Sequence, residues 1–577
     1  MRRWSRQTVQ EWTRLLSSRW SAQRWGVRLL AGVGLVALLV GMVALASNAA
    51  SPARATATAP TKQEIAQKIL KSRAGSRLSP GARIALEALA RGDHRAAVDS
   101  TGITFSKAKA HTGGHNPGGP GGLANIRVNN PGEDINQPDQ TTQSETSIAV
   151  SGKNVVVGFN DSQQTLLFLT PASDLSGVAV SHNGGATFSD LGTLPNATPT
   201  INFGDPWLAS DSSGVFYYAN LVDDPFQGAL LTGVSRSTDG GQTWTTPTEV
   251  PPPAGASSLF YSADKDAMTV GGAGNLYVVW DDFTETFDPT TGEFKVLSGL
   301  AVAHSTDGAR TWSTVYADQV PIFDSNDPCS FHQYIGAQPI VGPDGAVYDA
   351  ALRFDVNDPT CSGAPETESE YIFASHDGGA TFASKVKIAD VTSSTQGFGA
   401  FVLGAGQYMR NLEFPTLAFA GNTLYATWND GGDGSGHSHI RLATSTDNGG
   451  TWTTSWVTSG NNDEAQPSIS ADASGLHVLY YEISPTTSGA SVLDTMVSDS
   501  SNGSSFTTTR VTTQSFPGVY NIPNFDPIIA TAYMGDYISC VSSGGHQYFA
   551  WGDNRDVVTS FLWPRGRHDP NVYFAAR

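Results

Sequence analysis

Pairs of short apolar segments recur along residues 145–577. In each pair a Gly-containing turn joins one apolar run to a second run that ends in aromatic and acidic residues, as in ETSIAV…VVVGFND from Glu145 and FPTLAF…LYATWND from Phe414. Further pairs begin at Asp205, Lys265, Gln338, Gln466 and Gly535. Short apolar runs bounded by Gly and polar turns are typical of antiparallel strands. The pattern therefore predicts seven strand pairs, each the inner half of one blade of a β-propeller.

A second motif follows six of these pairs. Its clearest copies are STDGGQTW at residues 237–244, STDGARTW at 305–312 and STDNGGTW at 445–452. Variants are SHNGGATF from Ser181, SHDGGATF from Ser375 and DSSNGSSF from Asp499, so the copies stand 54 to 70 residues apart. That period, with short strands and Gly-rich turns, favours one blade per copy over a helical solenoid. We call these six segments the repeat turns.

The chemistry of the repeat turns points to a known class. Asp or Asn before Gly tolerates positive φ, and its side chain accepts hydrogen bonds from its own turn. The Thr-Trp pair then begins the next strand with β-forming residues. In these features the motif resembles the Asp-box, or BNR repeat, of sialidases and related propeller families. The resemblance implies an all-β fold with a single propeller over residues 124–577, and purely structural roles for Asp239, Asp307, Asp377 and Asp447.

The number of blades follows from the strand pairs. Seven is the preferred count, and six is the alternative because the sialidases that the motif resembles have six blades. The seventh pair, from Gly535, has no repeat turn and is followed by NVYFAA at residues 571–576 as its third strand. Its outer strand is predicted at residues 126–128, just before the first pair, which would close the ring and leave no exposed edges.

The first 123 residues differ from the propeller. Residues 1–28 hold seven Arg and one Glu, and residues 29–47 include an uncharged apolar run long enough to cross a bilayer. The positive-inside rule places the propeller outside the cytoplasm. We predict a retained transmembrane anchor, with cleavage after small residues near Ala50 and secretion as the alternative. Residues 48–123 are predicted as a linker with two short helices, capped at Thr61 and Ser79, that form a stalk or pack on the propeller.

Net charge limits the classes of binding partner, and the cysteines suggest one local pairing. The net charge is −19 although the first 28 residues are basic, and such an acidic body repels phosphate backbones, so no nucleic-acid partner is expected. Cys329 and Cys361 lie in similar Asn-Asp-Pro contexts. In an exported protein they form a local disulfide or remain two thiols, and the sequence leaves both open. Cys540 is expected to be a small core residue.

Strand direction locates the candidate site. In an antiparallel blade the start of the first strand and the end of the second lie on one face of the disc, which we call the mouth, whereas the repeat turns lie on the opposite face. Polar residues gather at the predicted mouth. The candidate catalytic residues are Glu145, Asp205, Asp264 and Glu413. The candidate substrate-binding residues are Lys265, Gln338, Arg353, Arg410, Gln466, Tyr537 and Arg555. Such a ring suits a polar ligand such as a sugar, and it equally suits a hydrated tunnel with hydrogen bonds inside the ring.

The sialidase resemblance does not extend to the catalytic motif. Sialidases carry an Arg two residues before a Pro at the start of a first strand, where its planar fork binds the substrate carboxylate. The corresponding residues here are Gly204, Ala337, Glu413 and Ala465. The nearest candidate, Arg410, lies three residues too early. Other glycoside hydrolysis needs only a suitably spaced pair of carboxyl groups.

These features give two hypotheses about function. The first is an exported, membrane-anchored, sialidase-like propeller that binds and hydrolyses extracellular glycans or glycoproteins. The alternative is a non-catalytic propeller that binds protein or glycan at the cell surface. No cofactor is predicted, and no metal site, because His111 and His115 lack a completing ligand set and the Gly-rich loop of residues 430–439 is more typical of a mobile blade loop than of a cation site.

Overall fold

The computed structural model describes residues 58–92, 115–116, 123–131, 142–161, 174–196, 200–224, 229–257, 259–395, 399–404, 406–520, 534–559 and 564–577. All of them belong to one compact unit, residues 56–577, which is separate from residues 1–55. The predicted membrane segment, residues 29–47, lies outside the described residues. Within the described ranges, no helix is both long and apolar enough to span a membrane.

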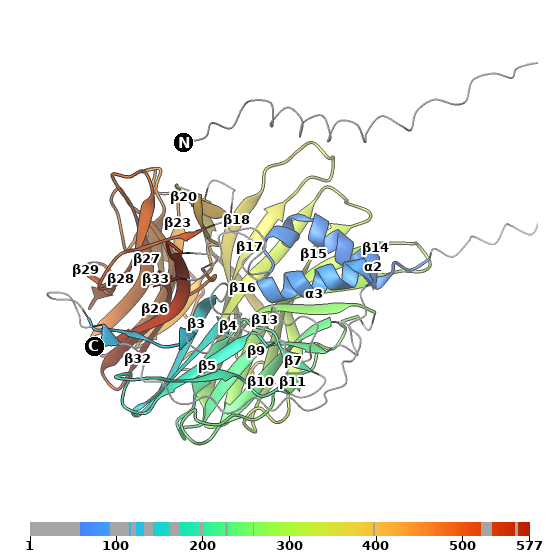
Figure 1. The fold of residues 1–577 in the computed structure, drawn as a ribbon. Helices are drawn as coiled ribbons and strands as arrows, with labels where there is room; N and C mark the ends of the chain where they lie inside the picture. The colour runs from blue at the N-terminus through green and yellow to red at the C-terminus, as the bar shows by residue number, and fades with distance from the viewer. Residues whose placement is uncertain are drawn as a thin grey trace, which may run out of the picture. The chain divides into compact units, whose positions relative to one another are not determined.

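Seven antiparallel sheets form the blades, as the strand pairs predict (Figure 1). Blade 1 contains β3 (Gln143–Ser151), β4 (Asn154–Asp161), β5 (Ser176–Ser181) and β6 (Ser189–Thr193). Blade 2 contains β7 (Ile201–Asn202), β8 (Trp207–Ser210), β9 (Phe216–Asp224), β10 (Ala229–Ser237) and β11 (Thr248–Val250). Blade 3 contains β12 (Tyr261–Gly272), β13 (Asn275–Phe287), β14 (Phe294–Ser305) and β15 (Ser313–Asp324).

The remaining blades follow the same order. Blade 4 contains β16 (Phe331–Val341), β17 (Val347–Val356), β18 (Thr367–Ser375) and β19 (Ser384–Val391). Blade 5 contains β22 (Thr416–Ala420), β23 (Thr423–Asp430), β24 (His439–Ser445) and β25 (Thr453–Trp456). Blade 6 contains β26 (Asp463–Asp472), β27 (Gly475–Pro485), β28 (Ser491–Ser500), β29 (Thr507–Arg510) and β30 (Phe516–Pro517). A small separate sheet joins β20 (Ala400–Gly404), β21 (Gln407–Arg410) and β31 (Val519–Tyr520).

Blade 7 closes the ring with strands from both ends of the propeller. It contains β32 (Ser539–Ser543), β33 (His546–Val558) and β34 (Arg567–Ala576), to which β2 (Asn125–Arg127) and then β1 (His115–Asn116) are added. In β2, Ile126 pairs with Phe574 and Arg127 with Tyr573. The predicted closing strand and the count of seven blades are therefore confirmed, and the six-bladed alternative is wrong.

The repeat turns connect the third and fourth strands of blades 1 to 6, as predicted from strand order. In blade 2, Asp239 accepts hydrogen bonds from the Thr243 amide at 2.9 Å, the Thr243 hydroxyl at 2.6 Å and the Ser237 hydroxyl at 2.8 Å. Blades 3, 4 and 5 repeat the pattern at Asp307, Asp377 and Asp447. Each of these carboxylates thus holds its own turn together.

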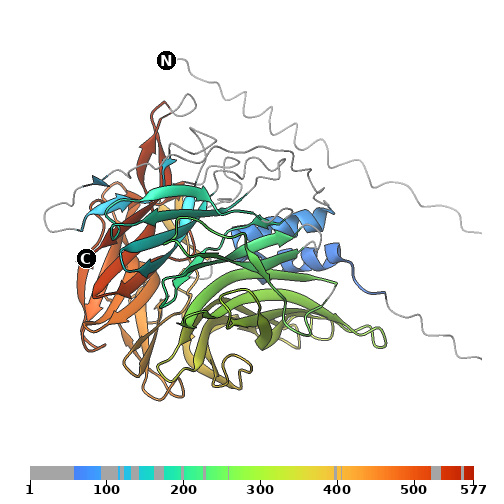
Figure 2. The ribbon, with the colours of Figure 1, turned by 90° about the horizontal axis from the view of Figure 1, so that it is seen from below.

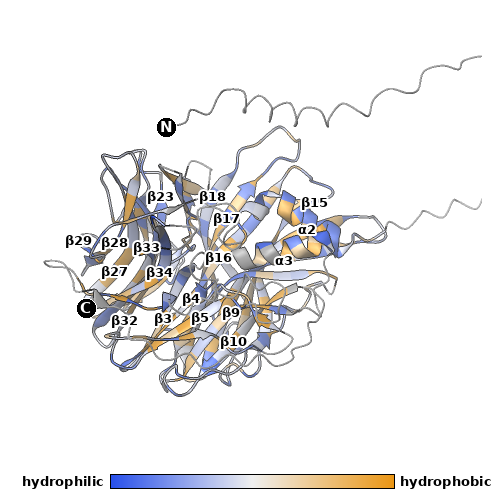
Figure 3. Cartoon of the chain, in the orientation of Figure 1, coloured by the Kyte–Doolittle hydropathy of each residue, from blue (hydrophilic) through white to orange (hydrophobic). Residues whose placement is uncertain are grey.

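The core is formed mainly by apolar side chains of the first three strands of the blades, and Figure 3 shows the hydropathy along these strands. Its largest buried side chains include Trp280, Trp428 and Trp551, one in the second strand of blades 3, 5 and 7. A buried indole needs a partner for its N–H. Trp428 donates to Asp430 at 3.1 Å and Trp551 to Asp553 at 2.8 Å, so the aspartate two residues later satisfies the ring nitrogen.

Residues 61–92 fold into two helices that pack on the propeller. They comprise α2 (Lys62–Lys71), the 3-10 turn η1 (Arg73–Ser76) and α3 (Pro80–Arg91). Both predicted caps are present, since Thr61 and Glu64 form a capping box and Ser79 accepts from the Ala82 amide. Of the two predicted arrangements, stalk or side packing, the structure has the second (Figures 1 and 2). The helices contact strands of blades 2 and 3, and Arg77, which lies between the helices, contacts Phe354 of blade 4. We call residues 61–92 the cap.

Candidate functional site

Each of several first strands is interrupted at the mouth by a short strained segment, a β-bulge in blades 1, 3, 4 and 6, and we call these segments the strained turns. Non-glycine residues with positive φ occupy these turns in four blades: Glu145 (φ 52°), Asp205 (φ 57°), Lys265 (φ 45°) and Gln466 (φ 50°). In blades 1, 3, 4 and 6 the pairing of the first two strands shifts register at the same place. A left-handed backbone conformation costs energy at a non-glycine residue, and residues in this conformation are often found at functional sites. The mouth is therefore the first place to look for a ligand site.

A charged cluster spans the centre of the ring at this face. The ammonium group of Lys265 in blade 3 forms an ion pair with Asp536 in blade 7, and Arg410 Nε lies 3.0 Å from Asp536 Oδ1. Blades 3 and 7 are not neighbours, so these side chains meet across the axis. Burial lowers the pKa of Lys265, but Asp536, Asp205 and Glu145 outweigh it, and the net shift of the pKa is upward. Lys265 therefore stays charged.

Two candidate catalytic carboxyl groups lie beside this cation in different environments. Glu145 accepts hydrogen bonds from Asn160 Nδ2 at 2.5 Å and from the Asp536 amide at 3.1 Å. Asp205 accepts from the Lys265 amide at 3.3 Å, whereas its Oδ1 has no hydrogen-bond partner among the described residues. Burial and the neighbouring charge of Glu145 raise the pKa of Asp205 well above its usual value. The two groups thus differ in their surroundings: Glu145 accepts two hydrogen bonds, whereas Asp205 has one oxygen without a partner and a raised pKa.

Further buried carboxyl groups surround this pair. Burial raises the pKa of Asp266, which follows Lys265, and of Asp281 in the middle of β13. The third candidate, Asp264, accepts the Ser79 amide of the cap on both oxygens, at 3.2 and 3.1 Å. Burial raises the pKa of Asp264, and the charge of Lys265 and the Ser79 hydrogen bonds oppose that shift. Sequence reasoning did not single out Asp266, whose signal is a charged residue inside an otherwise apolar strand.

Hydrogen bonds also link successive blades at the mouth. Asn160 Oδ1 in blade 1 accepts the Asp205 amide of blade 2 at 2.8 Å. Asp281 Oδ1 in blade 3 accepts the Gly336 amide of blade 4 at 3.3 Å. Asn429 repeats the arrangement between blades 5 and 6. Part of the polar ring therefore stabilises the propeller, which is the second interpretation that the sequence allows.

The other predicted site residues divide between the mouth and other places. At the mouth, Gln466 Nε2 donates to the carbonyl oxygens of Gly535 at 2.8 Å and Arg410 at 3.2 Å. Tyr537 donates to the Pro206 carbonyl at 2.9 Å. Away from the charged cluster, Gln338 Oε1 accepts the Leu417 amide at 2.6 Å. In blade 4 the strained turn is formed by Gly336 (φ 69°), two residues before Gln338.

Three predicted residues are held in separate polar clusters. Arg353 Nε binds Asp355 at 2.9 Å, and Arg555 forms an ion pair with Asp553 at 2.5 Å. Glu413 accepts the Ser394 amide at 2.9 Å and the Ser394 hydroxyl at 2.6 Å. Burial and the charge of Glu413 raise the pKa of Glu368 to about 8, so a second group of carboxyl groups lies in blades 4 and 5.

A disulfide joins Cys329 and Cys361, whose Cα atoms lie 5.3 Å apart. Cys540 is buried and unpaired. Within the described ranges, no three His, Cys, Asp or Glu side chains are grouped so as to hold a metal ion. At the start of β24, His439 Nδ1 lies 2.6 Å from Glu464 Oε2, and its Nε2 lies 3.4 Å from Oδ2 of Asp433 in the loop that follows β23. The acidic and histidine side chains there thus satisfy each other.

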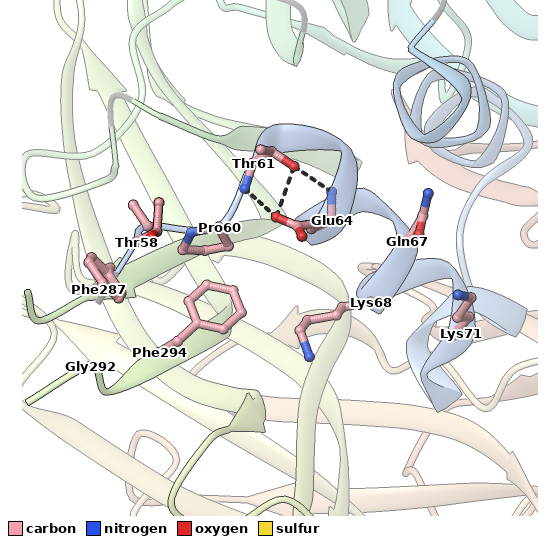
Figure 4. Close-up of a pocket in the computed structure, with 11 residues that line it drawn as sticks. Thr58, Pro60, Thr61, Glu64, Gln67, Lys68, Lys71, Phe287, Gly292 and Phe294 are labelled. Atoms are coloured by element: carbon pink, nitrogen blue, oxygen red, sulfur yellow. Dashed lines mark hydrogen bonds between the residues drawn. The ribbon is translucent and has the colours of Figure 1, made fainter. Parts of the chain in front are cut away.

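A pocket of about 720 Å³ lies beside the start of α2 (Figure 4). Phe287 and Phe294 line one side, and Glu64, Lys68 and Lys71 of α2 line the other. The ammonium group of Lys68 lies 3.8 Å from the centre of the Phe323 ring, so a propeller side chain already binds this cation. None of the predicted site residues lines this pocket.

Comparisons with known proteins leave the family of this chain open. No protein-family model and no curated protein matches it. Among solved structures, it is similar to a protein of unknown function from Dyadobacter fermentans (17% identity over 65% of this chain and 98% of that one, TM-score 0.38). It is also similar to Trypanosoma rangeli sialidase (15% identity over 66% of this chain and 58% of that one, TM-score 0.35). A third similar structure is an α-L-arabinofuranosidase of Fusarium graminearum (14% identity over 66% of this chain and 99% of that one, TM-score 0.40). The match thus spans 58% of the sialidase's length, and TM-scores of this size assign neither activity nor site residues.

Proposed function

We propose that the chain is a glycoside hydrolase-like propeller whose mouth binds an extracellular glycan and cleaves it with Asp205 and Glu145. The observation that carries the proposal is the difference between these two neighbouring carboxyl groups. Glycoside hydrolysis needs one carboxyl group that holds a proton and one that is ionised. Asp205 is buried with a raised pKa, and Glu145 is held by two hydrogen-bond donors.

The roles follow from these environments. Asp205 donates its proton to the glycosidic oxygen as the leaving group departs, and Glu145 acts as the base or nucleophile at the sugar carbon. Lys265 and Arg410 supply positive charge beside both groups and offer donors for sugar hydroxyl groups. Glu145 and Asp205 are 0% and 1% exposed, so substrate entry requires movement at the mouth, and we propose that the cap, which binds the neighbouring Asp264, is the part that moves.

The test is a release assay with the full chain on a panel of neutral and sialylated glycosides. Turnover by the native chain should fall by about 10²-fold or more in Glu145→Gln and Asp205→Asn, because the substitutions remove the base or nucleophile and the proton donor. A matched control is Asp553→Asn, which changes a buried carboxylate that is paired with Arg555 away from the cation cluster. Turnover that survives both mouth substitutions would contradict the assignment.

A second candidate is a non-catalytic propeller that binds protein or glycan. The blade-to-blade hydrogen bonds of Asp205, Gly336 and Gln466 favour it, because they give the polar ring a structural role. A glycan array run beside the release assay separates the candidates. Binding without turnover across the panel supports this second function and not the first.

We also propose that the chain is exported, anchored by residues 29–47, and related to the sialidase-like propellers whose Asp-box the repeat turns resemble. The Cys329–Cys361 disulfide supports export, because disulfides persist in oxidising compartments. Cell fractionation with protease treatment of intact cells tests the location. Protection of the propeller from external protease, in cells where a periplasmic or surface control is cleaved, would contradict export.

A further inference from the structure

The cap contacts the propeller through a buried arginine. The guanidinium group of Arg77, whose side chain is 11% exposed, binds Glu366 Oε1 at 2.6 Å and Gln333 Oε1 at 3.3 Å. Its central carbon lies 3.5 Å from the centre of the Phe354 ring. A carboxylate, an amide oxygen and an aromatic face together match the donors and the flat face of a guanidinium group. These residues form an arginine pocket on blade 4.

The propeller also binds the peptide backbone beside Arg77. Arg410 donates to the carbonyl oxygens of Arg77 at 2.8 Å and Leu78 at 2.9 Å. Asp264 accepts the amide of Ser79. Charged propeller groups therefore bind both backbone acceptors and a backbone donor of three consecutive residues. This is the chemistry by which a protein binds a peptide ligand.

The residues that bind the cap are those that would bind a substrate. Arg410 and Asp264 are both predicted site residues, and Arg410 also contacts Asp536 in the charged cluster. Apolar side chains add to the attachment, since Ile65, Ile69 and Leu78 are fully buried. The cap thus occupies two of the polar groups predicted at the mouth, Arg410 and Asp264.

We propose that the cap is a detachable intramolecular ligand, and that the Gln333, Phe354 and Glu366 pocket is an arginine-recognition site for a peptide. When the cap leaves, this face is free to bind a second arginine-bearing peptide, and the mouth opens. The consequence for catalysis rests on the proposed function of the mouth. The peptide site itself does not.

The test uses the full chain with a protease recognition sequence inserted between Gly92 and His115. After cleavage only non-covalent contacts hold the cap in place. A fluorescent peptide of residues 58–92 should then exchange into the propeller, as measured by fluorescence anisotropy. The same peptide with Arg77→Ala should bind at least ten-fold more weakly, since it loses a buried charge-assisted hydrogen bond and an aromatic contact.

Arg73 provides the matched control. It also pairs with Glu366, at 3.2 Å, but its side chain is 51% exposed, and exposed ion pairs contribute little. The Arg73→Ala peptide should bind within about two-fold of the native peptide. Equal losses for both peptides, no exchange after cleavage, or unfolding of the cleaved chain by circular dichroism would each overturn the proposal.

Glycoside turnover is measured separately with the same cleaved chain. If the mouth hydrolyses glycosides, added native peptide should inhibit release, and the Arg77→Ala peptide should inhibit at least ten-fold less effectively. Peptide exchange without any turnover would support the arginine site and contradict the proposed glycosidase function. Turnover that the peptide does not affect would contradict the role of the cap in closing the mouth.

Discussion

Aspartate side chains gather at both faces of the propeller, in the repeat turns at one face and around Lys265 at the other. In the repeat turns Asp377 and Asp447 are exposed, and hydrogen bonds from the Thr hydroxyl and amide four residues later help to lower the pKa of each carboxyl group to about 2. At the mouth Asp205 and Asp281 are buried, and burial raises their pKa.

The difference lies in where the partners come from. A repeat-turn aspartate finds its partners within four residues, so each turn is complete in itself. The mouth groups find theirs in other blades: Lys265 binds Asp536, which is 271 residues away. One residue type therefore stabilises a local turn at one face and forms a long-range, charge-rich cluster at the other. The second face is the one with unusual protonation chemistry.

The largest expected effect is at Lys265. Lys265→Met removes the cation that faces Asp536, Asp205 and Glu145, and leaves buried carboxylates uncompensated. The free energy of unfolding should fall by about 3–5 kcal/mol in urea denaturation, as for other broken buried ion pairs. Lys387→Met, which breaks the exposed pair with Asp390, should cost less than about 1 kcal/mol. Equal losses of unfolding free energy in the two variants would contradict the expectation that the buried ion pair contributes more than the exposed one.

The next effect concerns the strained turn of blade 4. A Cβ atom at Gly336 would lie 2.2 Å from the Phe414 ring, and the backbone has φ 69°. Gly336→Ala should cost about 2–5 kcal/mol, from left-handed strain and overpacking together. Gly345→Ala, at φ 80° in open space, should cost only the backbone strain of about 1–2 kcal/mol. Similar losses of unfolding free energy for the two variants in urea denaturation would contradict the predicted clash between residue 336 and the Phe414 ring.

The two faces should lose stability in opposite pH directions. Burial raises the pKa of Asp282, in the middle of β13, to about 7, although hydrogen bonds from Tyr316 and Tyr261 oppose this shift. A raised carboxyl pKa means that the folded chain binds more protons, so stability falls as pH rises from about 4 to 7. Asp282→Asn should flatten this fall and be more stable than the native chain at pH 8 by about 1–3 kcal/mol. Melting curves between pH 4 and 8 measure it, and an unchanged slope would contradict the burial of this group.

The smallest effect is at the repeat turns. The pKa of Asp377 is lowered to about 2, so its contribution to stability is present above pH 4 and is lost as pH falls through 2. Asp377→Asn should lower the melting temperature slightly at pH 7 and by less at pH 2, where the carboxylate is partly protonated. Melting curves at the two pH values test this. A larger drop in melting temperature at pH 2 than at pH 7 would contradict the lowered pKa of Asp377.

Local patterns explain how much of the fold could be predicted. The strand pairs, the repeat turns and the caps at Thr61 and Ser79 depend on neighbours within a few residues, so the sequence indicates them directly. The closing strand at residues 126–128 was predictable because an open ring leaves an unpaired edge.

The candidate site depends on contacts that the sequence does not display. Ala-Gln-Pro occurs in blade 4 at residues 337–339 and in blade 6 at 465–467, yet only Gln466 lies in the strained turn, because the register shift of blade 4 comes two residues earlier, at Gly336. The cap was predictable as two helices, but its docking depends on Arg77 and Glu366, which are 289 residues apart. Arg353 and Arg555 were placed at the mouth by strand order, whereas nearby aspartates bind both of them.

The most direct test of the account compares one aspartate from each face in the release assay. Kinetic constants are measured for Asp205→Asn and Asp447→Asn on the best glycoside of the panel. The account predicts that kcat/KM falls by about 10²-fold or more for Asp205→Asn and changes less than about two-fold for Asp447→Asn. Equal kcat/KM values for the two variants, or no turnover of any glycoside by the native chain, would contradict it.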